Sequence, residues 1–225
     1  MAGKQDSVII AIDGPAGAGK GTLAKRLAEA FDYAYLDTGT IYRAVGARLL
    51  DTGASASDSA AALEAAHNLD PRDLERSDLR REAVSGAASE VAVQPAVRQA
   101  LLEFQRRFAA CPPEGKAGAV LDGRDVGTVI CPDADAKLFL TASPEARAGR
   151  RHKELQESGV ESIYARVLED IKARDERDSC RAAAPLKPAE DAVTLDTTAL
   201  NADEVFAQAL RIIAEITGRT PIQQR

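Results

Sequence analysis

Apolar residues along the chain form two kinds of pattern. Short continuous apolar runs predict buried strands of a parallel sheet, and they occupy residues 7–13, 33–36, 117–121, 137–140 and 192–196. Between them, apolar residues recur every three or four positions, which predicts helices with one buried face. One of these helices starts at Lys20. The other six cover about 40–50, 60–66, 79–93, 95–108, 162–178 and 203–217. The alternation predicts an α/β fold, a five-stranded parallel sheet with helices on both faces.

The first predicted strand leads into a glycine-rich loop and a helix. The loop has the spacing GxxxxGK of a P-loop, whose backbone N–H groups surround phosphates while the lysine adds a positive charge. A hydroxyl that could hold Mg²⁺ comes one place later than in most P-loops, at Thr22, because Gly21 follows the lysine. The residues of the loop are Gly14, Pro15, Ala16, Gly17, Ala18, Gly19, Lys20, Gly21 and Thr22.

Asp122 directly follows the apolar run 117–121. In a parallel sheet this end lies beside the P-loop, where a carboxylate can orient magnesium-bound water. The alternative is an aspartate that opens an Asp-Gly turn. The neighbouring P-loop favours the metal role.

The helix over 162–178 carries a stripe that changes from aliphatic to charged. At 100° per residue, Arg174, Asp178 and Arg181 continue the face of the aliphatic residues Ile163, Val167 and Ile171. Buried charges are costly unless they are paired or bind a ligand. Two arginines beside an aspartate can pair with it and still offer donors to a phosphate. A structural ion pair near a helix end is the alternative.

Length and charge narrow the class of protein. A chain of 225 residues fits one domain, and no apolar run is long enough to span a membrane. The net charge of −6 argues against binding a nucleic-acid polymer.

Nine lysines and arginines nevertheless gather within 147–181, which fits either a local anionic ligand or a solvated charged helix. We expect a cytoplasmic protein, since residues 1–10 are too short and polar for a secretory signal.

Three further segments make the sequence resemble a known family. These are LDTGTIYR (36–43), DGRDVGTVI (122–130) and RDERDSCR (174–181). With the P-loop they resemble bacterial cytidylate kinases over nearly the whole chain. Two departures are Thr38, where many relatives have serine, and a short, alanine-rich segment 52–77, where many have a longer insertion.

The resemblance implies an activity and a set of site residues. It implies phosphorylation of CMP and dCMP by ATP with Mg²⁺, through direct in-line transfer, in a single P-loop kinase domain (1–225) with an acceptor-binding insertion at about 40–110 and a mobile lid at about 147–160. It implies Thr38, Tyr42, Arg43, Ser89, Arg98, Arg124, Asp125, Arg174, Asp178 and Arg181 as acceptor-side residues, Arg147 and Arg151 as lid residues on ATP, and Lys20, Arg124, Arg174 and Arg181 as catalytic.

Two other classes remain open. One is a P-loop kinase of UMP or of a non-nucleotide, and the other is a nucleotide-dependent switch without transfer activity. The missing NKxD motif and the clustered arginines argue against the switch. Because no exposed apolar stripe stands out, we expect a monomer.

Overall fold

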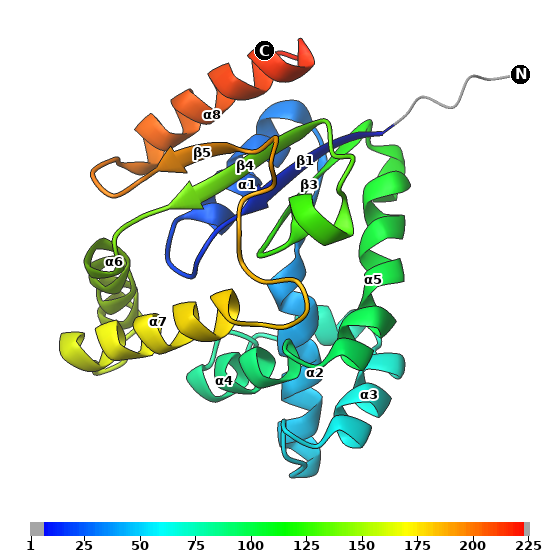
Figure 1. Ribbon diagram of the computed structural model, residues 1–225, viewed down its shortest axis with the longest axis vertical. Coiled ribbons are helices and arrows are strands. Elements are labelled where there is room, and N and C mark those ends of the chain that lie inside the picture. The colour runs from blue at the N-terminus through cyan, green and yellow to red at the C-terminus, as the bar shows by residue number, and fades with distance from the viewer. Residues whose placement is uncertain (1–6, 223–225) are drawn as a thin grey trace, which may run out of the picture. The chain divides into compact units, whose positions relative to one another are not determined.

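The computed structural model describes residues 7–222, and its ribbon is shown in Figure 1. The chain forms two compact units, one combining residues 1–36 with 108–225 and the other comprising residues 37–107. The division into one kinase domain with an acceptor-binding insertion and a lid stays a prediction.

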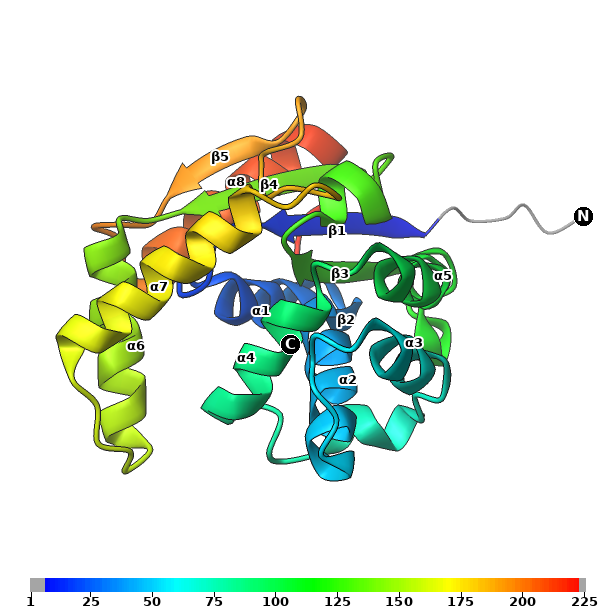
Figure 2. The same cartoon turned by 60° about the horizontal axis from the view of Figure 1, so that its bottom comes forward.

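A five-stranded sheet forms the centre of the first unit. Its strands are β1 (Val8–Asp13), β2 (Ala34–Asp37), β3 (Gly118–Gly123), β4 (Ala136–Thr141) and β5 (Val193–Asp196), in the order β2-β3-β1-β4-β5. β1 is parallel to β3 and to β4, and β4 is parallel to β5. Figure 2 shows β1, β4 and β5 running in the same direction. The predicted α/β fold with five strands is confirmed.

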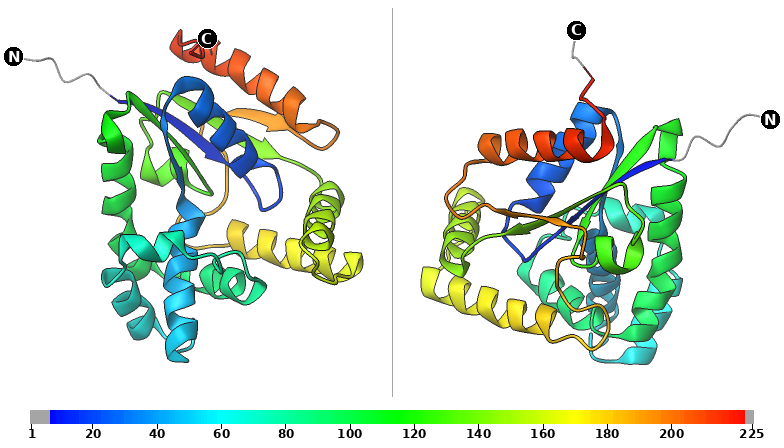
Figure 3. Two further views of the ribbon diagram at one scale, coloured as in Figure 1. Left: turned by 180° about the vertical axis from the view of Figure 1, so that it is seen from behind. Right: turned by 45° about the horizontal axis from the view of Figure 1, so that its top comes forward.

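Two helices cover one face of this sheet. They are α1 (Lys20–Phe31) and α8 (Ala202–Thr217), which lie side by side in Figures 1 and 3. Leu27 of α1 and Ile213 of α8 share a core with Ile12 of β1. Because side chains alternate across a strand, Asp13 points to the opposite face. There a π-helical turn, η3 (Val126–Ile130), contacts β1 and β3.

The remaining helices of the first unit are α6 (Pro144–Glu157) and α7 (Tyr164–Ser179), which pack on each other through Ala148, Val167 and Ile171. A short 3₁₀ turn, η2, spans Pro113–Gly115.

The helical periodicity predicts that Ile163 and, in the helix over 203–217, Ile216 lie on buried faces, and both predictions were wrong. Ile163 is 59% exposed because it precedes α7 with extended backbone and does not share the helical orientation. Ile216 is 46% exposed although it lies on the buried face of α8. It falls in the last turn, beyond Ile213, which is the last α8 residue in the core.

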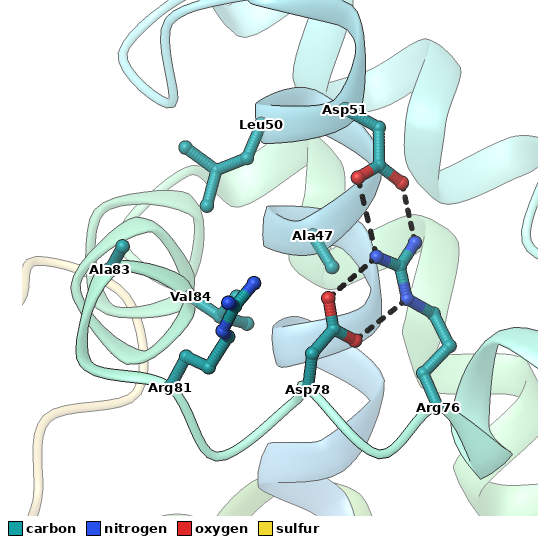
Figure 4. A pocket seen from close by; sticks show the side chains of 8 residues that line it. All are labelled: Ala47, Leu50, Asp51, Arg76, Asp78, Arg81, Ala83 and Val84. Carbon is teal, nitrogen blue, oxygen red and sulfur yellow. Dashed lines mark hydrogen bonds and ion pairs between the residues drawn. The ribbon is translucent and has the colours of Figure 1, made fainter.

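The second unit is helical. It contains α2 (Thr38–Thr52), α3 (Ser59–His67), the 3₁₀ turn η1 (Pro71–Glu75), α4 (Glu82–Val91) and most of α5 (Pro95–Ala110). Figure 4 shows how a guanidinium joins two of these segments: Arg76 pairs with Asp51 near the end of α2 at 2.5 Å and with Asp78 at 2.9 Å. The pairs fix the turn before α4 against α2.

Candidate active site

The glycine-rich loop between β1 and α1 approaches neighbouring backbone closely. A Cβ at Gly14 would lie 2.1 Å from the carbonyl oxygen of Leu140 in β4, and Gly14 has φ of +145°, so no other residue fits there without a shift. Gly19, with φ of +93°, then turns the chain into α1. These two glycines let the loop wrap tightly around the end of the sheet.

The start of α1 suits an anion. Gly19, the N-cap residue, has no side chain that could cap the helix, and the first turn of α1 holds no acidic residue. Lys20 is buried there, and its ammonium donates to the carbonyl oxygen of Pro15 at 2.8 Å. The N–H groups of the first turn, the helix dipole and a lysine together form a phosphate-binding arrangement.

Asp122 lies where the sequence predicted, next to the P-loop strand. It is the fifth residue of β3, pairs in register with Ile12 of β1 and is 6% exposed. The strand therefore runs one residue past Asp122 instead of ending before it. Tyr35 of β2 donates its hydroxyl hydrogen to Asp122 Oδ1 at 2.9 Å, which fixes the orientation of the carboxylate.

A second buried carboxylate, Asp13, stands at the end of β1. The backbone N–H groups of Val126 and Gly127 donate to its two oxygens at 2.8 and 2.7 Å. Burial raises the pKa of Asp13 to about 6, although both N–H groups and the more distant Lys20 lower it. The sequence offered one sign of this residue, a charge at the end of an apolar run.

Two of the three residues in the predicted charged stripe are buried, whereas Arg174 is only partly buried, and Arg181 lies just beyond the end of α7. Asp178 and Arg181 are 7% and 8% exposed, and Arg124 donates through Nε to Asp178 at 2.8 Å. Burial raises the pKa of Asp178, but Arg124, Arg174 and Arg181 outweigh it and hold the pKa below its ordinary value. Three cations thus surround one carboxylate, leaving an excess of positive charge.

The two predicted lid arginines have different surroundings. Arg147 is 3% exposed; it donates to the carbonyl oxygens of Ala142 and Ala16 and pairs with Asp175 of α7 through both terminal nitrogens. Arg151, one turn further along α6, is partly exposed and pairs with Glu154 at 2.9 Å. Arg147 is therefore attached to the P-loop backbone at the base of α6.

The second unit holds the other predicted acceptor residues. Thr38 and Tyr42 are buried in the first turns of α2, and Arg43 donates to Asp37 and Thr40 at 3.1 Å. Arg98 of α5 lies over the ring of Tyr42, 5.8 Å from its centroid. The guanidinium of Arg98 and the ring of Tyr42 therefore lie next to each other.

Ser89 of α4 has an unusual environment. The residue is 8% exposed, and its hydroxyl oxygen is buried without a hydrogen-bond partner among the described residues. A buried hydroxyl normally has a partner. The geometry therefore suits a side chain that bonds a ligand.

A hollow of about 300 Å³ lies elsewhere in this unit, beside Leu50, Arg76 and Arg81 (Figure 4). None of the predicted site residues lines it. We assign it no part in the site.

Three residues that touch the predicted site were missed by sequence reasoning. Asp13, Tyr35 and Asp175 each contact a predicted residue or segment far away in the chain, and a spacing pattern does not reveal such pairs. Only Asp13 carried a local signal.

The parallel sheet, the phosphate-binding loop at its carboxyl edge and the carboxylate beside that loop define a P-loop phosphotransferase. Comparison with known proteins identifies the family. The sequence model described as cytidylate kinase matches residues 10–215, and this chain belongs to the cytidylate kinase family.

Individual relatives agree with this assignment. The chain is 62% identical to a cytidylate kinase from Paramagnetospirillum magneticum, covering 92% of this chain and 98% of that one. It is 57% identical to a cytidylate kinase from Methylocella silvestris, covering 92% and 94%. The crystal structure of an uncharacterized protein from Eubacterium ventriosum is similar in fold, with a TM-score of 0.50 at 16% identity over 92% of this chain and 98% of that one.

Proposed function

We propose that this chain transfers the γ-phosphate of ATP to CMP and dCMP, giving CDP and dCDP. The observation that carries the proposal is the arrangement at the carboxyl ends of β1 and β3. There the uncapped start of α1 with Lys20 adjoins the buried carboxylate of Asp122. Membership of the cytidylate kinase family supports the choice of acceptor.

The donor side is assigned to the P-loop. Its backbone N–H groups and Lys20 would bind the β- and γ-phosphates of ATP, because they present positive charge without a competing side-chain cap. Arg147 and Arg151 would add charge over the phosphates from α6, and the bond from Arg147 to Ala16 would fix α6 against the loop.

Mg²⁺ is the expected metal. Asp122, acting through water, and the Thr22 hydroxyl would hold it, since both offer the oxygen atoms that Mg²⁺ prefers. The fit is supported by Asp122, a buried carboxylate whose Oδ1 is held by Tyr35. When bound, Mg²⁺ neutralises charge on the phosphate oxygens.

The acceptor side is assigned residue by residue from the family resemblance. In the second unit, Ser89 and Arg98 would read the cytosine ring, and Thr38, Tyr42 and Arg43 would contact the sugar and phosphate of CMP. The unpartnered hydroxyl of Ser89 supports its role. In the first unit, Asp125 is assigned to the base, Arg174 and Asp178 to the ribose, and Arg124 and Arg181 to phosphate.

The chemistry then needs little besides positioning. An oxygen of the CMP phosphate forms a bond to the γ-phosphorus while the bond from that phosphorus to the β–γ bridging oxygen breaks, releasing ADP. The attacking oxygen already carries negative charge, so no general base is required. The arginines around Asp178 stabilise the charge that passes between the two nucleotides.

The test is ADP release from ATP and Mg²⁺ with CMP, dCMP, UMP, AMP or no acceptor. We expect turnover to be strongest with CMP and dCMP and to be slow without an acceptor. Turnover with UMP or AMP but not CMP would contradict the assignment of the acceptor. ATP binding without turnover on any acceptor would contradict transfer activity altogether.

We also propose that the protein acts as a monomer in the cytoplasm, where both of its nucleotide substrates are found. Within residues 7–222, none of the helices has the length and apolarity needed to cross a membrane. Light scattering should give a mass near 23.8 kDa, and a multiple of that mass would contradict the monomer.

A further inference from the structure

Asp13 connects two segments of the first unit that are far apart in sequence. It immediately precedes the P-loop glycine Gly14, and it is 5% exposed. Its two carboxylate oxygens accept from the N–H groups of Val126 and Gly127 in η3. One side chain therefore joins the start of the P-loop to the segment that follows β3.

The turn η3 depends on this side chain. It is five residues long, and the carbonyl oxygen of Asp125 accepts from the N–H groups of both Val129 and Ile130. The first N–H groups of a helix have no partner within the helix, and here Asp13 accepts two of them. Its carboxylate thus determines where the chain leaves β3 through Arg124 and Asp125.

We propose that Asp13 is a positioning residue for the acceptor nucleotide. It holds Val126 and Gly127, and through them it fixes Arg124 and Asp125, which the proposed function assigns to CMP. The inference rests on that function, and it adds a residue that acts through the backbone of η3 without touching CMP.

Asp13 is ionised at neutral pH, because its pKa of about 6 lies below 7 and the two backbone N–H groups favour the charged form. Lys20 attracts its charge and Asp125 repels it. Lys137 contributes its aliphatic stem next to Gly127, while its ammonium pairs with Asp191 at 2.7 Å. Only the ionised form offers both oxygens as acceptors, because a protonated carboxyl uses one oxygen as a donor.

The first test is Asp13→Asn. Asparagine has the same shape, but its amide nitrogen cannot accept a hydrogen bond, so one of the two N–H groups loses its partner. We expect KM for CMP to rise about tenfold, with KM for ATP changed less than about twofold. Amide hydrogen exchange of Val126 and Gly127 should become faster in the same variant.

Asp135→Asn is the matched control. Asp135 accepts from the N–H of Ile9 at 2.7 Å, near the other end of β1. The same substitution there should leave both KM values unchanged, because no predicted site residue depends on that bond.

Gly127→Ala changes the residue that donates to Asp13 and is the alternative test if Asp13→Asn does not fold. The added methyl would lie 3.4 Å from Asp13 Oδ2 and 3.2 Å from Lys137 Cδ. We expect a smaller rise in KM for CMP, about threefold, again without a matching rise for ATP.

Two results would overturn the inference while the wild-type protein phosphorylates CMP in the same assay. One is an unchanged KM for CMP in these variants. The other is an equal rise in KM for ATP, which would place Asp13 on the donor side with Lys20. A wild-type protein inactive on CMP would instead contradict the proposed function.

Discussion

Asp13 and Asp178 are both buried carboxylates, yet their neighbours shift their pKa values in opposite directions. Asp13 has two backbone N–H partners and another carboxylate nearby, so burial dominates and its pKa rises to about 6. Asp178 has three arginines around it, so its pKa falls below the ordinary value despite burial. Asp178 therefore stabilises the folded state as an anion, whereas the charge on Asp13 costs stability.

This difference predicts the pH dependence of stability. Between pH 3.8 and about 6, Asp13 binds a proton in the folded state but not in the unfolded state. Its contribution to the free energy of unfolding therefore falls as pH rises through this window, by about 3 kcal/mol in all. Urea unfolding of wild type and Asp13→Asn from pH 4 to pH 8 should show the wild type losing stability relative to the variant.

Parallel stability curves for the two proteins would show that the pKa of Asp13 is ordinary. The Asp135→Asn variant is the control, since its carboxyl is exposed. Its curve should follow the wild type across the range.

At the scale of elements, α2 and α4 pack closely because one contact residue has no side chain. A Cβ at Gly46 of α2 would lie 3.0 Å from the backbone nitrogen of Ala88 and 3.1 Å from the Cβ of Ala87. Ser89 is the next residue of α4 after Ala88. The spacing of the two helices thus determines where this proposed base-reading hydroxyl lies.

Gly46→Val should therefore push α4 away from α2. We expect a loss of about 1 to 3 kcal/mol in the free energy of unfolding and a higher KM for CMP. Gly86→Ala is the matched control on α4, because nothing lies within 4 Å of a Cβ there. It should raise stability by up to about 1 kcal/mol, since alanine favours helix more than glycine.

Thermal unfolding and steady-state kinetics of the two variants check this prediction. Equal stability of Gly46→Val and wild type would mean that the helices can separate at no cost.

Most of the elements could be predicted from the sequence, because they depend on local patterns, but α6 (Pro144–Glu157) was not among the predicted helices. All five apolar runs became strands, and the helix over 60–66 was found as α3 (Ser59–His67). The turn η3 could not be predicted, since it depends on Asp13, more than a hundred residues away in the chain. The hydrogen bond from Tyr35 to Asp122 could not be predicted either, because the two residues are far apart in the chain.

The proposed site residues divide in a similar way. The P-loop and the Arg174–Asp178–Arg181 stripe followed from spacing alone. Ser89 and Arg98 came only from the family resemblance, because nothing in the pattern of α4 or α5 marks them. Their roles stay predictions.

At the scale of the whole molecule, nucleotide binding should appear as added stability. Any ligand that binds only the folded state raises the free energy of unfolding, by about 2.7 kcal/mol at 100 times its Kd. Lys20→Ala should fold but show much less stabilisation by ATP than the wild type. Thermal shift with and without ATP checks this.

Lys25→Ala is the control, since Lys25 lies on the exposed side of α1. It should keep the full ATP-dependent shift. Full stabilisation of Lys20→Ala by ATP would contradict the assignment of Lys20 to the phosphates.

The strand order of the sheet also has a consequence during protein synthesis. β1 is made first but lies between β3 and β4, whose residues leave the ribosome roughly a hundred residues later. At typical elongation rates that delay is about 5 to 20 s. The helical segment 37–107 is continuous and is complete before either partner strand exists. The nascent chain must therefore keep the apolar strand β1 unpaired for seconds, and during that time β1 is exposed to aggregation or to binding by a chaperone.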